Sequence, residues 1–173
     1  MENFTNETID TNQLPKFEEV TFTKLHPKYL RVVLINLALF IGMLILVPVL
    51  ISVFNSALFS QRIWLILGAV IPILSLLIIV LSYIGFHNKG FAFREHDVLF
   101  RHGIIATNTI VIPYNRVQHV ALHEGLIPRY FGLAKIEIFT AGGSSSDIEI
   151  PGIEKEQAEK IKQLLMGKIQ KQL

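Results

Sequence analysis

A long apolar block dominates the pattern of hydrophobic and polar positions along the chain. From Val32 to Phe86 it contains a single Asp, Glu, Lys or Arg residue, Arg62. A bilayer core of about 30 Å is crossed by roughly 20 apolar residues in a helix, because a helix satisfies its own backbone polar groups. Small polar residues at 55–62 divide the block. We therefore predict transmembrane helices at 30–54 and 63–86, joined by an extracytoplasmic loop.

The hairpin is expected to remain in the mature protein. Its first span follows a long polar segment and exceeds the roughly 7–15-residue apolar stretch of a cleaved export signal. Pro48 and Pro72 lie inside the predicted spans, where each removes a helical hydrogen-bond donor. They could mark a moving part, but simple bending of each helix is favoured because proline is frequent in membrane helices.

Positive charges flank the outer ends of the two predicted spans. They are Lys24, Lys28 and Arg31 before the first span and Lys89, Arg94 and Arg101 after the second. The connecting loop offers only Arg62. Because cytoplasmic flanks carry an excess of Lys and Arg, we expect both termini to lie in the cytoplasm.

Beyond the hairpin, the apolar period changes from helical to alternating. Short runs rich in β-branched and aromatic residues are separated by Gly, Pro, Asn and Asp, which is typical of strands and turns. The runs are 91–94, 98–102, 109–112, 117–122, 134–140 and 147–150. Ile136 and Ile138 alternate with polar residues, as in a half-buried antiparallel strand. Pro151 and Gly152 are expected to close the sheet.

The two ends of the chain differ in character. Apolar residues spaced three and four apart over 154–171 predict an amphipathic helix, which would complete a cytoplasmic domain at 88–171. Residues 1–15 are polar without periodicity and are predicted to be a disordered tail. Residues 16–29 alternate in polarity and favour a short extended juxtamembrane segment.

Three segments of the soluble region resemble a known family. They are IPYNRVQHV at 112–120, GLIPRYFGLAKIEIFTAGG at 125–143 and IEIPGI at 148–153. The chain resembles bacterial PH-like proteins of the membrane-flanked, YdbS-like family, in which two transmembrane helices directly precede the domain. The resemblance implies an α+β PH-like domain, with two bent antiparallel sheets of about 6–7 strands capped by a C-terminal helix. It implies a multi-pass protein of the bacterial cytoplasmic membrane and no settled activity.

Composition and motifs narrow the functional classes. A net charge of +2 without basic runs interleaved with aromatics argues against binding of nucleic acid. Cysteine is absent, which excludes disulfides, cysteine nucleophiles and thiolate metal sites. No Gly-x-Ser-x-Gly or His-Glu-x-x-His motif occurs, and neither span contains Asp or Glu. We predict that the protein is not an enzyme and has no catalytic residue, cofactor or metal site.

A few local patterns leave a chemical alternative open. His119 and His123 could bind a metal on a helix, but in a strand they lie about 13 Å apart, too far for one ion. The glycine- and serine-rich 142–146 loop could offer backbone donors to a phosphate, although a hairpin turn is favoured. His102 and the predicted 96–97 turn could converge on a ligand, although surface turn residues are the favoured interpretation.

Basic residues are the candidate binding groups for a protein partner or a lipid headgroup. They are Lys28, Arg31, Lys89, Arg94, Arg116 and Arg129. The first four lie near the membrane in sequence, where anionic headgroups attract each charge by about 1 kcal/mol. A topogenic role alone accounts for most of these four. For Arg116, capping of nearby carbonyl groups in a turn is favoured over ligand binding. Arg129 follows Pro128 and is expected to anchor a short irregular turn.

Three functions from different classes stay open. The favoured one is a membrane-tethered interaction or assembly module, with envelope maintenance or stress defence as the setting that the resemblance implies. Its partner would be a second copy or a larger membrane protein with repeated PH-like domains. The alternative is recognition of anionic lipid headgroups by the basic rim. An accessory subunit of a transporter or membrane enzyme is the third, and the absence of charges from the spans argues against it.

Overall fold

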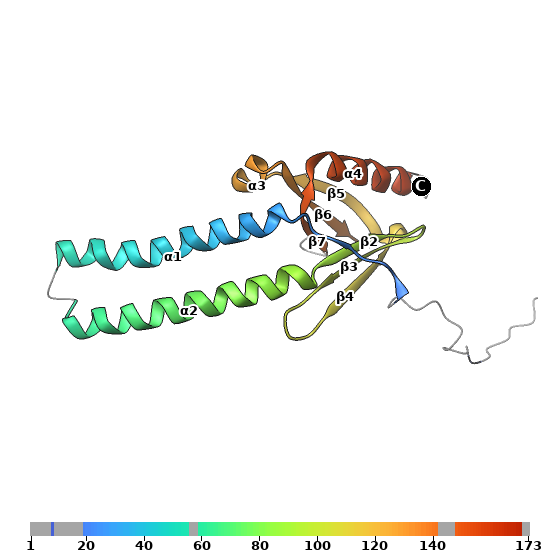
Figure 1. Cartoon of the computed structure of the whole chain (residues 1–173). Helices are drawn as coiled ribbons and strands as arrows, with labels where there is room; N and C mark the ends of the chain where they lie inside the picture. The colour runs from blue at the N-terminus through green and yellow to red at the C-terminus, as the bar shows by residue number, and fades with distance from the viewer. Residues whose placement is uncertain (1–7, 9–18, 56–58, 142–147, 171–173) are drawn as a thin grey trace, which may run out of the picture.

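Two long helices extend from one end of a small β-structure in the computed structural model, which describes residues 8, 19–55, 59–141 and 148–170 (Figure 1). The helices are α1, Lys28–Phe54, and α2, Gln61–Asn88, and each runs through its internal proline without interruption. In the most apolar stretch of each helix, only 6% of α1 and 0% of α2 is buried. Because a core helix of a soluble protein is largely buried, these exposed apolar surfaces fit a lipid environment.

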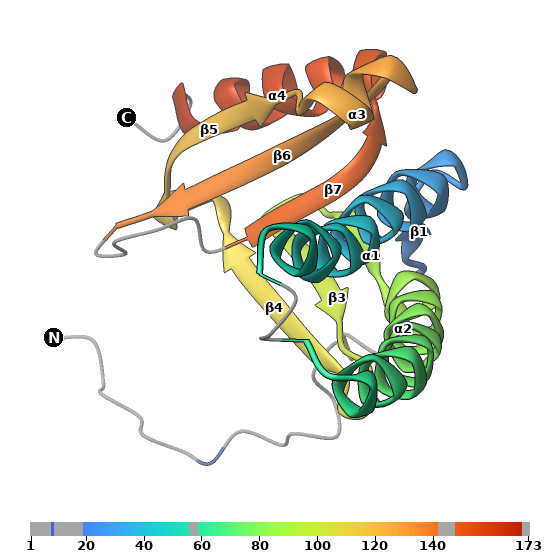
Figure 2. The same ribbon diagram turned by 90° about the vertical axis from the view of Figure 1, so that its left-hand side faces the viewer.

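Seven strands form two antiparallel sheets that follow the helical hairpin and its N-terminal arm. The first sheet has the order β1 (Thr23–Lys24), β2 (Gly90–Phe93), β3 (Asp97–His102) and β4 (Asn108–Pro113). The second sheet has the order β5 (Val117–His123), β6 (Leu133–Thr140) and β7 (Ile148–Glu154). The two sheets face each other, and α4 (Lys155–Gln170) packs against the second sheet (Figure 2). We call the two sheets together the barrel; with α4, it confirms the expected PH-like architecture.

The core lies between the sheets and under α4. Alternation along β6 buries Ile136 and Ile138 completely, while the polar residues between them stay partly exposed, as the pattern predicts. On α4, Ala158 and Leu165 are fully buried, which follows from their seven-residue spacing on one helical face. Apolar burial of this kind supplies the main driving force for the fold.

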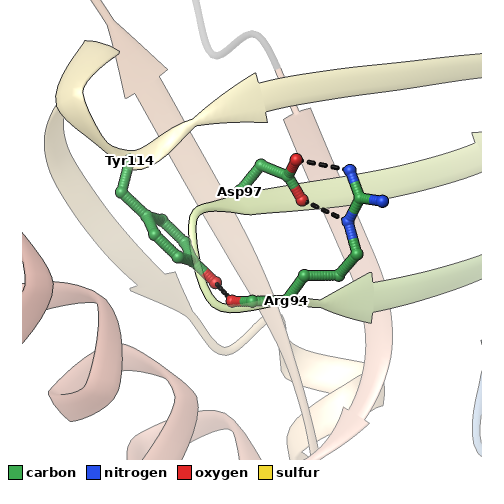
Figure 3. A network of polar contacts seen from close by, with 3 residues as sticks. All are labelled: Arg94, Asp97 and Tyr114. Atoms are coloured by element: carbon green, nitrogen blue, oxygen red, sulfur yellow. Dashed lines mark hydrogen bonds and ion pairs between the residues drawn. The ribbon is translucent and has the colours of Figure 1, made fainter. Parts of the chain in front are cut away.

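Tyr114 anchors the link between the two sheets. It begins the short 3-10 helix Tyr114–Arg116 that connects β4 to β5, and its side chain is buried. Its hydroxyl donates a hydrogen bond of 2.7 Å to the carbonyl of Arg94, whose guanidinium forms an ion pair with Asp97 (Figure 3). Burial raises the pKa of Tyr114 to about 12, because a charged phenolate would lose its hydration.

The N-terminal arm ties the helical hairpin to both sheets. β1 precedes α1 but pairs with β2, the strand that follows α2. The backbone N–H of His26 donates a hydrogen bond of 2.9 Å to the carbonyl of Gly152 in the second sheet. The arm therefore bridges the sheets at the end from which the helices extend (Figure 1).

The structure corrects two local expectations. Pro151 and Gly152 do not close the sheet, because β7 continues to Glu154 through a bulge at which the register with β6 shifts. Gly152 has a φ of +66°, which a bulge accommodates with glycine. The irregular turn expected at Arg129 is instead the last turn of a short helix, α3 (Leu126–Tyr130).

Some predictions fall on residues that the structure does not describe. The predicted tail at 1–15, apart from residue 8, lies outside the described residues. So do the middle of the 55–62 connection and the glycine- and serine-rich 142–146 loop with its phosphate alternative.

Candidate functional site

An open cavity lies where the barrel meets the helical hairpin. Its volume is about 540 Å³, and its lining residues come from α1, from the residue that follows α2 and from both sheets. They are Tyr29, Lys89, Phe100, His102, Ile110, Lys135, Glu149 and Pro151. We call this space the junction cavity. It joins polar groups from distant parts of the chain at the end of the barrel that carries the helices (Figure 1).

The junction cavity adjoins an apolar cleft at the base of the hairpin. The cleft has a volume of about 780 Å³ and shares Tyr29, Lys89 and His102 with the cavity. Its other lining residues are mostly apolar and include Val33 of α1 and Leu81 of α2. A polar compartment thus opens directly onto a nonpolar one, which is the arrangement that an amphiphilic ligand requires.

Local secondary structure explains how the polar groups reach the cavity. Lys89 follows the last residue of α2 and precedes β2, so the change from helix to strand turns its side chain towards the barrel. Lys135 lies on β6 and alternates with buried neighbours, while His102 ends β3. Tyr29 lies in the first turn of α1, with its ring centroid 6.4 Å from that of Phe86.

The two lysines of the junction cavity differ in their electrostatic environment. The Lys135 ammonium pairs with carboxylate oxygens of Glu137 at 2.5 Å and Glu149 at 3.0 Å. The hydrogen bond to Glu137 is the main cause of its raised pKa. Within the described part of the chain, the Lys89 ammonium has neither an ion pair nor a hydrogen bond, and burial lowers its pKa. Lys89 is therefore a partly buried cation without a counter-ion among the described residues.

The structure does not gather the six predicted basic residues into one site. Lys28 and Arg31 are exposed in the first turn of α1, and Arg129 is exposed on α3. Arg94 lies in the turn between β2 and β3, where Asp97 neutralises it. Only Lys89 among them lines the junction cavity.

Arg116 caps no carbonyl group in the part of the chain that the structure describes. It is exposed, and its guanidinium forms no hydrogen bond with any residue that the structure describes. The link that Arg116 was expected to stabilise is held by Tyr114, whose backbone N–H also donates to the carbonyl of His96 at 3.0 Å. The buried aromatic residue performs this role because its hydroxyl reaches a carbonyl from inside the barrel.

Sequence reasoning did not identify most of the cavity-lining groups. Tyr29 was interpreted only as part of the juxtamembrane segment at 16–29, and Lys135 only as a polar residue in a strand alternation. His102 ends β3, as the predicted run at 98–102 requires, but it was interpreted as a surface residue and instead lines the cavity. The sequence does show polar residues that alternate with apolar ones in β6 and β7. Their position beside α1, however, follows only from the register between the two strands.

The fold and the cavity can now be compared with known proteins. The family model described as the bacterial PH domain matches residues 29–169, which includes both long helices and nearly all of the barrel. The chain belongs to this bacterial PH domain family. The expected family relationship is thus confirmed, and the β-structure described above is its PH domain.

Two relatives of this PH domain protein are transmembrane proteins of Bacillus subtilis (strain 168). The UPF0699 transmembrane protein YdbS is 32% identical over 69 residues, which are 40% of this chain and 42% of YdbS. The UPF0699 transmembrane protein YdbT is 32% identical over 83 residues, which are 46% of this chain and 17% of YdbT. The match thus spans less than half of either relative, and no solved structure matches the chain significantly.

The comparisons and the structure together identify a membrane protein with transmembrane helices and a PH domain. The apolar, exposed α1 and α2 are each long enough to cross a membrane, and the relatives' names describe transmembrane proteins. The family is one of PH-like transmembrane proteins and is not a known enzyme family.

Proposed function

We propose that this protein binds the phosphate group of a membrane phospholipid in the junction cavity, with the acyl chains in the adjoining cleft. The observation that carries the proposal is the Lys89 ammonium between a polar and an apolar compartment, where no described residue pairs with it. The sequence-based alternative placed lipid binding on an exposed basic rim, whereas this proposal places it in the junction cavity.

The position of Lys89 along α2 suits a phosphate contact. Trp64 and Tyr83 lie 19 residues apart, which corresponds to about 29 Å of helix and to the thickness of the hydrocarbon core. Aromatic residues of this kind prefer the two membrane interfaces. Lys89 lies six residues beyond Tyr83, or about 9 Å further along the axis, at the depth of lipid headgroups.

Charge compensation supports a phosphate as the ligand group. A partly buried cation without a partner has lost hydration without gaining an ion pair, and an anionic oxygen would replace that hydration. Lys135 is already neutralised by two carboxylates, so it adds little net positive charge. Glu149 beside it would repel a second anionic group, which favours a headgroup with one phosphate.

The test compares phospholipid bound to full-length variants after purification in mild detergent. Lys89→Gln removes the charge from the cavity, whereas Lys28→Gln removes the same charge from an exposed position on α1. Lys89→Gln is expected to lower the phospholipid per protein several-fold by mass spectrometry, and Lys89→Arg to retain most of it. Equal phospholipid in the Lys89→Gln and Lys28→Gln proteins would refute the proposal.

A second candidate is assembly with another copy or with a larger membrane protein containing repeated PH-like domains. The match to 17% of YdbT supports it, because a much longer transmembrane protein contains a segment similar to this chain. Exposed Arg116 and Arg129 are the proposed contacts. Crosslinking in the native membrane should recover a stoichiometric partner that is lost in Arg116→Ala or Arg129→Ala. Recovery of the protein alone would count against assembly.

We further propose that the protein is multi-pass in the bacterial cytoplasmic membrane, with both termini and the PH domain in the cytoplasm. The basic flanks of α1 and α2 support this orientation. Pairing of β1 with β2 is consistent with it, since the strands adjoin opposite ends of the hairpin sequence. A role in envelope maintenance or stress defence belongs to the same proposal and rests on the family resemblance alone.

A further inference from the structure

Two separate parts of the barrel carry unusually exposed apolar side chains. Ile105, in the turn between β3 and β4, is 99% exposed. Leu126 and Tyr130, one helical turn apart on α3, are 89% and 86% exposed. Outside the two long helices, these are the most exposed large hydrophobic residues in the described part of the chain. Single exposed apolar side chains occur on most proteins, but these three are informative because they lie at the same end of the barrel.

Both parts lie at the end of the barrel from which the transmembrane helices extend. In Figure 1, α3 lies beside the base of α1, and the β3–β4 turn lies beside the base of α2. The contacts agree, because α3 packs near α1 and the space beside Gly85 of α2 is filled by Ile104, 3.3 Å from an added Cβ. The apolar groups therefore flank the helical hairpin on two sides.

The depth of this contact along α2 matches a membrane boundary. Trp64 and Gly85 are 21 residues apart, which corresponds to about 32 Å of helix. A hydrocarbon core is about 30 Å thick, so a boundary at Trp64 puts the other boundary close to Gly85. Ile104 touches α2 at this level, and Ile105 is its neighbour.

We propose that the PH domain docks on the adjacent membrane leaflet through two anchors, Ile105 on one side of the helices and Leu126 with Tyr130 on the other. The aliphatic side chains enter the boundary between headgroups and acyl chains, and the tyrosine ring lies at headgroup level with its hydroxyl in water. Arg129, which is exposed on α3 next to Tyr130, can contact anionic headgroups. Ile105 also lines the apolar cleft beside the junction cavity, whereas Leu126 and Tyr130 line neither space, so the anchor on α3 separates docking from phospholipid binding.

Docking through two anchors would fix the tilt of the domain. One membrane contact on each side of the hairpin would oppose tilting of the domain in either direction.

The natural absence of cysteine allows a direct test with single labels on the full-length chain. The variants are Ile105→Cys, Leu126→Cys and Tyr130→Cys, each carrying an environment-sensitive fluorophore. The control is His96→Cys in the exposed β2–β3 turn, separated from the β3–β4 turn by the length of β3, or about 20 Å. Each protein is placed in nanodiscs of phosphatidylethanolamine and phosphatidylglycerol, with or without lipid spin-labelled near the headgroup.

The expected result is quenching by spin-labelled lipid several-fold stronger at all three anchor positions than at position 96. Quenching at either anchor as weak as at the control would overturn the proposal. Blue-shifted emission without lipid quenching would also overturn it, because this result indicates coverage by protein. The replaced side chains are almost fully exposed, so the substitutions remove few packing contacts. Quenching of the labels at positions 126 and 130 is expected to be the same when the chain also carries Lys89→Gln, because these positions do not line the junction cavity.

Discussion

Gly152→Ala tests how the helical hairpin is attached to the PH domain. The glycine has a φ of +66°, and a Cβ added to it would lie 2.5 Å from both Cβ and Cγ of Tyr29 in α1. Alanine would incur about 1–2 kcal/mol for the left-handed backbone conformation. Overpacking against Tyr29 would add about 1–3 kcal/mol, because the first turn of α1 would have to move away from β7. The expected loss in the free energy of unfolding is about 2–5 kcal/mol.

Gly132→Ala is the matched control for the backbone part of this loss. Gly132 has a φ of +71°, but nothing lies within 4 Å of an added Cβ. Its substitution should therefore cost only the conformational part, about 1–2 kcal/mol. The remaining difference between the two variants, about 1–3 kcal/mol, would report the contact with Tyr29.

The measurement is reversible denaturation of the full-length protein in detergent, followed by circular dichroism. In a protein of this size, 1 kcal/mol corresponds to roughly 2–4 °C in the melting temperature, so thermal unfolding offers a second readout. Tyr29→Ala removes the ring but keeps the Cβ at 2.5 Å, so it should relieve only part of the cost of Gly152→Ala, and a double-mutant cycle measures this coupling. Equal losses for the two glycine variants, with no coupling to Tyr29, would refute the packing argument.

Two further predictions concern the Tyr114 anchor and the orientation in the membrane. Tyr114→Phe removes the hydrogen bond to the Arg94 carbonyl and should lower the free energy of unfolding by about 0.5–1.5 kcal/mol in chemical denaturation. The pKa of Tyr114 is raised from 10.0 to about 12. Its contribution to the free energy of unfolding should therefore be present below pH 10 and fall as the pH rises towards 12. Tyr114→Phe should lack this pH dependence. A reporter fused after Leu173 should be active in the cytoplasm, and activity only outside it would reverse the proposed orientation.

Strong periodicity explains why most of the fold could be predicted from the sequence. The hairpin follows from two apolar segments that are too long for ordinary core helices, and the alternation in β6 correctly identifies its buried face. The short helix α3 could not be predicted in this way, because Leu126–Tyr130 is too short to show a helical period and contains Pro128. Tertiary contacts and a hydrogen bond of 2.9 Å from the Arg129 N–H to the Gly125 carbonyl define it instead.

The candidate site could be predicted only in part, because charge is visible in a sequence and environment is not. Lys89 was identified from its charge and position after the second span, but its lack of a partner depends on how the barrel packs against α1 and α2. Arg94 has the same charge, yet Asp97 three residues later neutralises it in a turn. The grouping of Tyr29 with Lys135 requires the register of β6 and β7, which single-strand patterns do not contain.

Pairing between β1 and β2 has a consequence for the order of biosynthesis. Thr23 and Lys24 are made before either long helix, but their partners Gly90 and Phe91 are made only after both. The first sheet therefore stays incomplete until the ribosome has passed the whole hairpin, and such long-range pairing forms slowly. Membrane insertion then precedes completion of the domain. A fragment that begins after α2 would lack β1, leaving the outer edge of β2 unpaired and open to association with another chain.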